Sequence, residues 1–267
     1  MRHRTPRVSV APALALALVV GACSAGPAAS PAASLTILGA ASLKGALDEA
    51  KAAYAKADPR TILTISTDSS SALETQIEQG APADVFLSAD ATNPKKLVEE
   101  GLAEGAAVTF AINKLTVIVP TATTAGIASP ADLARSGIKI VAAGDEVPIT
   151  KYANQLLDNL AKEPGYPADF VAKVAANIVS KEDNVKAVVA KVELGEGDAG
   201  IVYETDAKAS SKVLTVPVPD TANVPATYAG VVVKASRNAT AARAFLDWLA
   251  GPEGEAILAS FGFLPPS

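Results

Sequence analysis

Residues 69–90 of the chain read SSSALETQIEQGAPADVFLSAD, and this stretch indicates the fold class. Ser71 and Glu74 fit the S-x-x-E capping box, which predicts a helix that begins near Ala72 and ends at Gly80. The apolar VFL that follows predicts a short buried strand. A helix that is followed this closely by a buried strand is typical of α/β proteins.

The same stretch suits an anion. The first turn of a helix presents free backbone N–H groups and a partial positive charge. Ser69, Ser70 and Ser71 add hydroxyl donors there without adding positive charge. Taken alone, however, the stretch favours an ordinary capped helix at the protein surface.

The first 22 residues have the pattern of a targeting segment. Three arginines within residues 2–7 form a basic head, and the apolar run that follows, residues 8–22, is shorter than the ~20 residues of a membrane-spanning helix. The run ends in Val-Gly-Ala-Cys, which resembles the lipobox of bacterial lipoproteins and implies cleavage before Cys23 and lipidation of that cysteine. The alternative is an uncleaved secretory signal with a chance cysteine.

Residues 24–33 (SAGPAASPAA) are small and uncharged, which predicts that residues 23–33 form a lipidated cysteine and a flexible tether. The folded part then begins near Ser34, and its length suits one large α/β domain or two lobes. Cys23 is the only cysteine, so the chain has no internal disulfide.

Charge and composition exclude several functions. Loss of residues 1–22 would change the formal net charge from −5 to −8, which disfavours nucleic acid as a partner and requires any anion site to be local. The only histidine, His3, and the only methionine, Met1, lie in the same segment. Transition-metal sites built on nitrogen or sulfur and Ser-His or Cys-His nucleophiles are therefore excluded from the mature chain.

Beyond the tether, apolar strand patterns alternate with amphipathic helix patterns along the chain. We expect strands at residues 35–38, 62–65, 85–87, 115–119, 138–142, 178–179, 200–203, 213–216 and 230–233. Such alternation predicts an α/β protein with mostly parallel sheets flanked by helices. Ligands of these sheets bind at the carboxyl ends of strands, where helices begin.

Two motif matches fail in their structural context. Residues 195–200 match G-x-G-x-x-G, but a helix pattern precedes them and a strand pattern follows, which is the reverse of a dinucleotide-binding loop. Residues 136–139 match S-x-x-K, but Gly137 separates the serine from a lysine that enters a strand. Neither match indicates catalysis.

Several expected helix starts carry hydrogen-bond donors and follow the ends of strands. They are Ser42, the serines 69–71, residues 148–150 and residues 183–185, and Tyr203 adds a phenol at the end of its strand. Each one alone is a plain helix cap. Together, on one edge of the sheets, they predict a pocket lined by N–H and O–H groups.

The residues carry a resemblance to a known family. The segments GAASL (39–43), SSSALETQIEQGAPADVFLSAD, GDEVPITKYA (144–153) and 182–207 resemble the molybdate-binding components of ABC transporters. The closing GPEGEAILASFGF (251–263) is common among solute-binding proteins more broadly. The similarity covers essentially all of residues 35–264.

The resemblance implies a two-lobe, type II periplasmic-binding-protein fold with the ligand in the cleft between the lobes. Residues 35–113 with 223–267 would form lobe 1, and residues 114–222 would form lobe 2. The implied molybdate ligands are the hydroxyls of Ser42, Ser70 and Tyr203 and the backbone N–H groups of Ile149 and Val185. Ile149-Thr150 stands where the family often has a smaller pair, so we expect bulk near the site there.

The resemblance further implies a non-enzymatic receptor that binds molybdate outside the cytoplasmic membrane and delivers it to a membrane permease. No cofactor and no direct metal-cation ligand are expected, and the protein is expected to be a lipid-anchored monomer. A tungstate or sulfate receptor is the alternative within the binding class. Outside it, the alternatives are a carboxylate-dependent hydrolase on the same scaffold and a purely structural surface lipoprotein.

Overall fold

The structure is a computed structural model that describes residues 1, 3 and 33–266. The chain from Ala32 to Ser267 forms one compact unit. Apart from Met1, His3 and Ala33, the predicted signal segment, the lipid-attachment residue Cys23 and the tether lie outside the described residues. None of the helices in the described part combines the length and the apolar character needed to cross a bilayer.

The folded unit contains two five-stranded sheets. The first has the strand order β2-β1-β3-β10-β4 and consists of β1 (Ala33–Ala40), β2 (Thr61–Asp68), β3 (Val85–Ser88), β4 (Ala103–Asn113) and β10 (Ala226–Val233). The second has the order β7-β6-β8-β5-β9 and consists of β5 (Leu115–Pro120), β6 (Ile140–Ala143), β7 (Ile178–Glu182), β8 (Ala199–Tyr203) and β9 (Val213–Val216). We refer to the first sheet with its helices as lobe 1 and to the second as lobe 2.

Both sheets are mixed. In lobe 1, β1 pairs in parallel with β2 and β3, whereas β10 runs antiparallel to β3 and β4. In lobe 2, β6 pairs in parallel with β7 and β8, whereas β5 runs antiparallel to β8 and β9. The predicted two-lobe α/β fold is thus confirmed, but each sheet has as many antiparallel as parallel pairings. The expectation of mostly parallel sheets was wrong because the strands that follow the crossings between lobes, β5 and β10, enter their sheets in the opposite direction.

The chain passes between the lobes twice. It leaves lobe 1 from β4 to β5 at Lys114 and returns between β9 and β10. Asn223, in the returning segment, accepts the Leu115 N–H at 3.0 Å and donates to the Leu115 carbonyl at 2.9 Å. The two crossing segments are therefore joined to each other by hydrogen bonds. The predicted boundaries near residues 113 and 223 remain a prediction.

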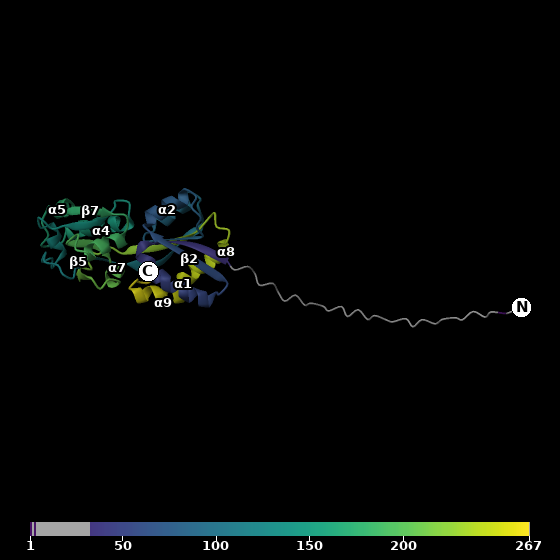
Figure 1. The fold of residues 1–267 in the computed structure, drawn as a ribbon. Helices are drawn as coiled ribbons and strands as arrows, with labels where there is room; N and C mark the ends of the chain where they lie inside the picture. The colour runs from purple at the N-terminus through teal and green to yellow at the C-terminus, as the bar shows by residue number, and fades with distance from the viewer. Residues whose placement is uncertain (2, 4–32, 267) are drawn as a thin grey trace. The chain divides into compact units, whose positions relative to one another are not determined.

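Helices flank each sheet. Lobe 1 carries the 3₁₀ helix η1 (Ala41–Leu43), α1 (Lys44–Ala57), α2 (Ser70–Glu78), α3 (Thr92–Glu99), α8 (Ala239–Leu249) and α9 (Pro252–Phe261). Lobe 2 carries the 3₁₀ helix η2 (Pro130–Ala134), α4 (Pro148–Leu160), α5 (Phe170–Ala176), α6 (Val185–Glu193) and α7 (Glu204–Lys208). The C-terminal helices α8 and α9 lie beside α1, as the yellow and purple-blue ribbons of Figure 1 show, so both ends of the folded unit build lobe 1.

Helix α2 begins earlier than its sequence pattern predicts. It starts at Ser70 with Ser69 as N-cap, and neither Ser69 nor Ser71 makes the predicted capping bond. The Ser71 hydroxyl instead donates to the Glu146 carbonyl of lobe 2. Glu74 is buried and pairs with Lys96 of α3 at 2.8 Å, so its carboxylate faces a neighbouring helix rather than the helix start. The predicted end is confirmed, because Gly80 adopts a left-handed φ of 86° just beyond the helix.

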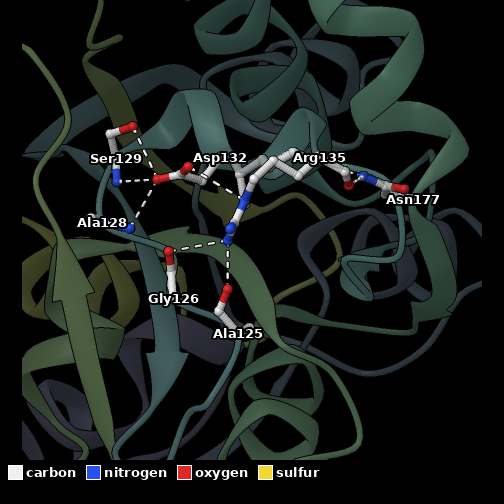
Figure 2. A network of polar contacts seen from close by, with 8 residues as sticks. Ala125, Gly126, Ala128, Ser129, Asp132, Arg135 and Asn177 are labelled. Carbon is white, nitrogen blue, oxygen red and sulfur yellow. Dashed lines mark hydrogen bonds and ion pairs between the residues drawn. The ribbon is translucent and has the colours of Figure 1, made fainter.

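A polar network fixes the segment before β6 (Figure 2). The Asp132 carboxylate accepts the backbone N–H groups of Ala128 and Ser129 at 3.0 and 2.9 Å, and Arg135 donates to the Gly126 carbonyl at 3.1 Å. Asn177 donates to the Arg135 carbonyl at 2.7 Å, which ties the segment to the end of α5. These groups bond to one another and hold the loop that leads to Ser136. The S-x-x-K match is therefore part of a loop-to-strand junction, as expected.

The G-x-G-x-x-G match is a turn, as its context predicts. Gly195 has a φ of 73° directly after α6, and β8 follows at Ala199. A Cβ atom on Gly197 would lie 2.5 Å from the Val141 side chain, so close packing against β6 requires glycine there. Two elements have no counterpart among the predicted ones, namely β4 and the short helix α7.

Candidate anion-binding site

A small cavity lies where several strands end and helices begin. About 210 Å³ of its space is not filled by atoms, a volume that includes space open to solvent, and its walls come from both lobes. All five residues predicted as ligands line it: Ser42, Ser70, Ile149, Val185 and Tyr203. The remaining wall residues are Ala40, Ala41, Asp68, Ser69, Ala89, Val147, Pro148 and Asn184. The structure therefore brings the five together, while their contact with a ligand stays a prediction.

On the lobe 1 side, two serine hydroxyls reach the cavity. Ser70 is the first residue of α2 and is 1% exposed. Its oxygen accepts the backbone N–H of Ala89 at 3.0 Å. Because a backbone N–H can only donate, the Ser70 proton is left to donate elsewhere. Ser42, in η1, lies 2.8 Å from the hydroxyl of Tyr228 on β10.

On the lobe 2 side, two helix starts present backbone N–H groups. Pro148 occupies the first position of α4 and has no N–H, so Ile149 is the first residue of that helix able to donate. Val185 is the first residue of α6, and the side chain of Asn184 caps this helix by accepting the Ala187 N–H at 3.1 Å. The N–H groups in a first turn have no carbonyl partner within their helix. Both helices therefore direct donors and a partial positive charge at the cavity.

Tyr203 supplies a phenol from the end of β8. Its side chain is buried, and its hydroxyl has no hydrogen-bond partner among the described residues. Burial raises the pKa of Tyr203 well above the usual value, and the neighbouring Tyr228 and Tyr152 act in the same direction. The phenol therefore keeps its proton and remains a donor. A buried hydroxyl without a hydrogen-bond partner lowers stability, so Tyr203 has a donor to offer to a molecule in the cavity.

Three tyrosines extend from the cavity through the two lobes. The ring of Tyr203 lies 6.5 Å from that of Tyr152 on α4 and 5.6 Å from that of Tyr228 on β10, both in edge-to-face geometry. Burial and the nearby Asp90 carboxylate raise the pKa of Tyr152 to about 12. Burial also raises the pKa of Tyr228 well above its usual value. All three phenols are therefore neutral near neutral pH.

The reasoning from sequence missed Asp68, the one carboxylate among the cavity's lining residues. Asp68 ends β2, and one of its oxygens accepts the Ser69 N–H at 2.8 Å and the Asn184 side-chain amide at 3.1 Å. The second bond joins the lobes beside the cavity. Its position directly before the three serines was the available signal, but a carboxylate was not expected beside an anion.

An ion pair between a half-exposed lysine and a buried carboxylate lies close to Tyr203. Lys186, the residue after Val185, contacts the carboxylate of Asp206 at 2.8 Å. Burial raises the pKa of Asp206, and the charge of Lys186 opposes that shift. The pair links the first turn of α6, which presents the Val185 N–H, to α7, which directly follows Tyr203.

The arrangement suits binding of a small anion and is poorly suited to hydrolysis. Five hydrogen-bond donors converge on one small cavity, each at or next to a helix start. Hydrolysis by carboxylates needs one carboxyl group as general acid and a second as general base, whereas Asp68 is the one carboxylate among the residues that line the cavity. A two-lobe α/β fold with such a cavity defines the class of binding proteins for small solutes.

Comparisons with known proteins agree with that class. The chain belongs to the family described as bacterial extracellular solute-binding protein, whose model matches residues 35–264. It is 32% identical over 261 residues to the molybdate-binding protein ModA of Mycobacterium tuberculosis, with 95% of each chain covered. Members of this family are solute-binding proteins of the cell exterior rather than enzymes.

Solved structures share the fold. The periplasmic molybdate-binding protein of Azotobacter vinelandii is 27% identical, with a TM-score of 0.73, 87% of this chain and 100% of that chain covered. The sulfate-binding protein SubI of Mycobacterium tuberculosis has a TM-score of 0.77 at 20% identity, with 87% of each chain covered. At that identity the second likeness concerns the fold alone.

Proposed function

We propose that the protein binds molybdate outside the cytoplasmic membrane and delivers it to the permease of an ABC transporter. The two lobes would enclose the tetrahedral dianion between Ser42 and Ser70 on one side and Ile149, Val185 and Tyr203 on the other. The observation that carries the proposal is the buried Tyr203 hydroxyl, which faces a donor-lined cavity without a partner of its own. The ModA relative at 32% identity supports molybdate as the ligand.

The physical basis is the solvation of a buried dianion by neutral donors. Burial of such an ion is costly unless its oxygens are hydrogen-bonded. A hydrogen bond to a charged group contributes about 1.5–3 kcal/mol, so several are needed together. The helix starts at Ile149 and Val185 add the partial positive charge of the helix dipole, which stabilises the anion without a positively charged side chain. Asp68 opposes the anion, but its oxygen already accepts two hydrogen bonds.

Molybdate, tungstate and sulfate share charge and geometry, so donors alone do not distinguish them. Selection against the smaller sulfate would come from the spacing of the donors across the cavity. Ile149 contributes here, because its side chain is 2% exposed and lies in the cavity wall. We expect tungstate to bind as molybdate does and sulfate to bind much more weakly.

A thermal-shift screen tests the ligand class. An anion that binds only the folded protein at 100 times its Kd stabilises it by about 2.7 kcal/mol, which is a shift of several degrees. Molybdate and tungstate are expected to raise the melting temperature, while sulfate and phosphate at the same concentration leave it unchanged. A shift with sulfate as large as that with molybdate would indicate a sulfate receptor, and no shift with any anion would indicate a purely structural protein.

We also propose that Cys23 is lipidated and anchors the protein as a monomer to the outer face of the cytoplasmic membrane. The support is the Val-Gly-Ala-Cys sequence after a basic and apolar leader. The tether to Ser34 would then leave the folded unit free to reach a permease. Replacement of Cys23 by Ala is expected to move the protein from the membrane fraction to the soluble fraction. Full membrane retention of that variant would contradict the anchor.

A further inference from the structure

The direction of the hydrogen bond at Ser42 can be worked out from its surroundings. Ser42 and Tyr228 lie 2.8 Å apart, and by distance alone either hydroxyl is able to donate. Tyr228 is 0% exposed, so leaving its proton without an acceptor would be costly. Among the described residues its hydroxyl has two hydrogen-bonding neighbours, Ser42 and the side-chain amide nitrogen of Asn113. The direction depends on which of these accepts.

The Asn113 amide is fixed by its backbone neighbour. Its oxygen accepts the Lys114 N–H at 2.9 Å, and a backbone N–H can only donate, so the amide nitrogen must face the other way. That nitrogen donates to the Thr205 hydroxyl at 2.8 Å and lies 3.5 Å from the Tyr228 oxygen. The contact with Tyr228 is long, but an amide nitrogen cannot accept a proton. Asn113 therefore does not take the Tyr228 proton.

Ser42 is then the acceptor that remains for Tyr228. Once its oxygen accepts from Tyr228, the single Ser42 proton points away from that bond, and Ser42 lines the cavity. The reverse direction would leave the buried Tyr228 proton unpaired and turn the Ser42 lone pairs toward an anion. Ser70 shows the same arrangement, with the Ala89 N–H in the place of Tyr228. Both lobe 1 serines are thus held as donors by a group behind them.

We propose that Tyr228, with Asn113 behind it, is a positioning residue that fixes Ser42 as a hydrogen-bond donor to the bound oxyanion. Neither residue lines the cavity, and both act through Ser42. We call the hydrogen-bonded series Asn113–Tyr228–Ser42 the relay. It begins where the chain crosses between the lobes, because Asn113 is the last residue of β4 and also bonds Thr205 of lobe 2. This inference rests on the proposed function, because it requires an oxyanion in the cavity.

A double-mutant cycle measured by isothermal titration with molybdate tests the relay. Tyr228→Phe is expected to weaken binding about 10-fold, because Ser42 becomes free to rotate its proton away. In a Ser42→Ala background the same substitution is expected to change the affinity less than twofold, since its target is gone. In a Ser70→Ala background it should again cost about 10-fold, because the two serines are held independently.

Tyr54→Phe is the matched control. Tyr54 is also a buried tyrosine of lobe 1, but it packs against Phe245 and Trp248 at 5.1 and 5.0 Å, away from the cavity. The Tyr54→Phe substitution should leave the affinity for molybdate unchanged. Melting temperatures of the ligand-free variants show whether Tyr228→Phe has disturbed the fold more than Tyr54→Phe does.

The outcomes separate the relay from the proposed function. Unchanged affinity of Tyr228→Phe, or an equal loss in the Ser42→Ala and Ser70→Ala backgrounds, overturns the relay while molybdate binding by the unaltered protein stands. If the unaltered protein binds sulfate or phosphate instead of molybdate, the proposed ligand is wrong, and the same cycle with that anion tests the relay. If it binds none of these anions, both inferences are overturned.

Discussion

The two sides of the cavity supply different kinds of donor. Lobe 1 contributes the hydroxyls of Ser42 and Ser70, each held from behind by another hydrogen-bonding group. Lobe 2 contributes backbone N–H groups at the starts of α4 and α6, together with the phenol of Tyr203. The lobe 1 donors are therefore properties of particular side chains, whereas two of the lobe 2 donors are properties of the backbone.

The two sides of the cavity therefore differ in how they tolerate amino-acid substitution. A serine replaced by alanine loses its donor, but a helix start keeps its N–H with any residue except proline. Ile149 illustrates the point, because its donor is the backbone N–H, which does not depend on the size of the side chain. We therefore expect the binding free energy to depend on side-chain identity mainly in lobe 1 and at Tyr203.

The largest expected effect is that of Ser70→Ala. Loss of one hydrogen bond to a charged ligand costs about 1.5–3 kcal/mol, which corresponds to about 10- to 150-fold in Kd. Ser71→Ala is the control, because its exposed hydroxyl bonds the Glu146 carbonyl and does not line the cavity. Titration with molybdate measures both. Equal losses in the two variants would mean that Ser70 is not a ligand.

Tyr203→Phe should separate binding from stability. We expect binding to weaken about 10-fold because one donor is lost, while the ligand-free protein becomes more stable by about 1 kcal/mol because an unpaired buried hydroxyl is removed. Titration gives the first quantity and chemical denaturation gives the second. A variant that loses stability and keeps its affinity would place the hydroxyl in a structural role.

Asp68→Asn should have a smaller effect of the opposite sign. The carboxylate lies in the cavity wall, where it repels an anion, and asparagine retains an oxygen that can accept from Ser69 and Asn184. We expect about 3- to 10-fold tighter binding, with the gain reduced by added salt. Weaker binding would mean that the hydrogen bond between Asp68 and Asn184 matters more than the charge.

The raised phenol pKa values predict how pH acts on each lobe. The pKa values of Tyr203 and Tyr228 lie well above the usual value, so neither donor is lost and binding should be constant from about pH 7 to about pH 9.5. A raised folded-state pKa contributes stability that is complete below the unfolded value of about 10 and is lost as the pH rises above it. Melting temperature should therefore fall above about pH 10, and less steeply in Tyr203→Phe. Binding that falls already near pH 8 would contradict the neutral-phenol assignment.

The smallest expected effect on binding is that of Ile149→Val. The backbone N–H is retained, so the affinity for molybdate should change less than about twofold. Removal of one buried methylene group costs about 0.5–1.5 kcal/mol of stability. Titration and denaturation of this variant provide the backbone counterpart to Ser70→Ala. A loss of affinity as large as that of Ser70→Ala would show that the side chain, rather than its N–H, decides binding.

The strand and helix alternation was predictable because buried strands and amphipathic helices have strong periodic patterns. The cavity could be anticipated for the same reason, since donor-bearing helix starts follow strand ends. β4 was missed because much of it is exposed and its sequence, AEGAAVTFAIN, lacks a regular alternation. The antiparallel insertion of β10 depends on the return of the chain from lobe 2, which no local pattern records.

Tertiary contacts account for the remaining errors. Ser71 and Glu74 fit a capping box, but each finds a partner outside its own helix, Glu146 and Lys96 respectively. These contacts override the local preference and let α2 begin at Ser70. Asn113 and Tyr228 were missed as contributors to the site because the sequence separates them from each other and from Ser42. Asp68 was missed for another reason, because a carboxylate was not expected beside an anion. Tyr228 is 186 residues from Ser42.

The most direct test of the account is a pair of isothermal titrations of the unaltered mature protein, one with molybdate and one with sulfate. We predict one molybdate bound per chain and sulfate binding at least about 100-fold weaker, a difference of about 2.7 kcal/mol that donor spacing must supply. Sulfate binding as tight as molybdate, or no heat of binding with molybdate, would contradict the assignment of this cavity as a molybdate site.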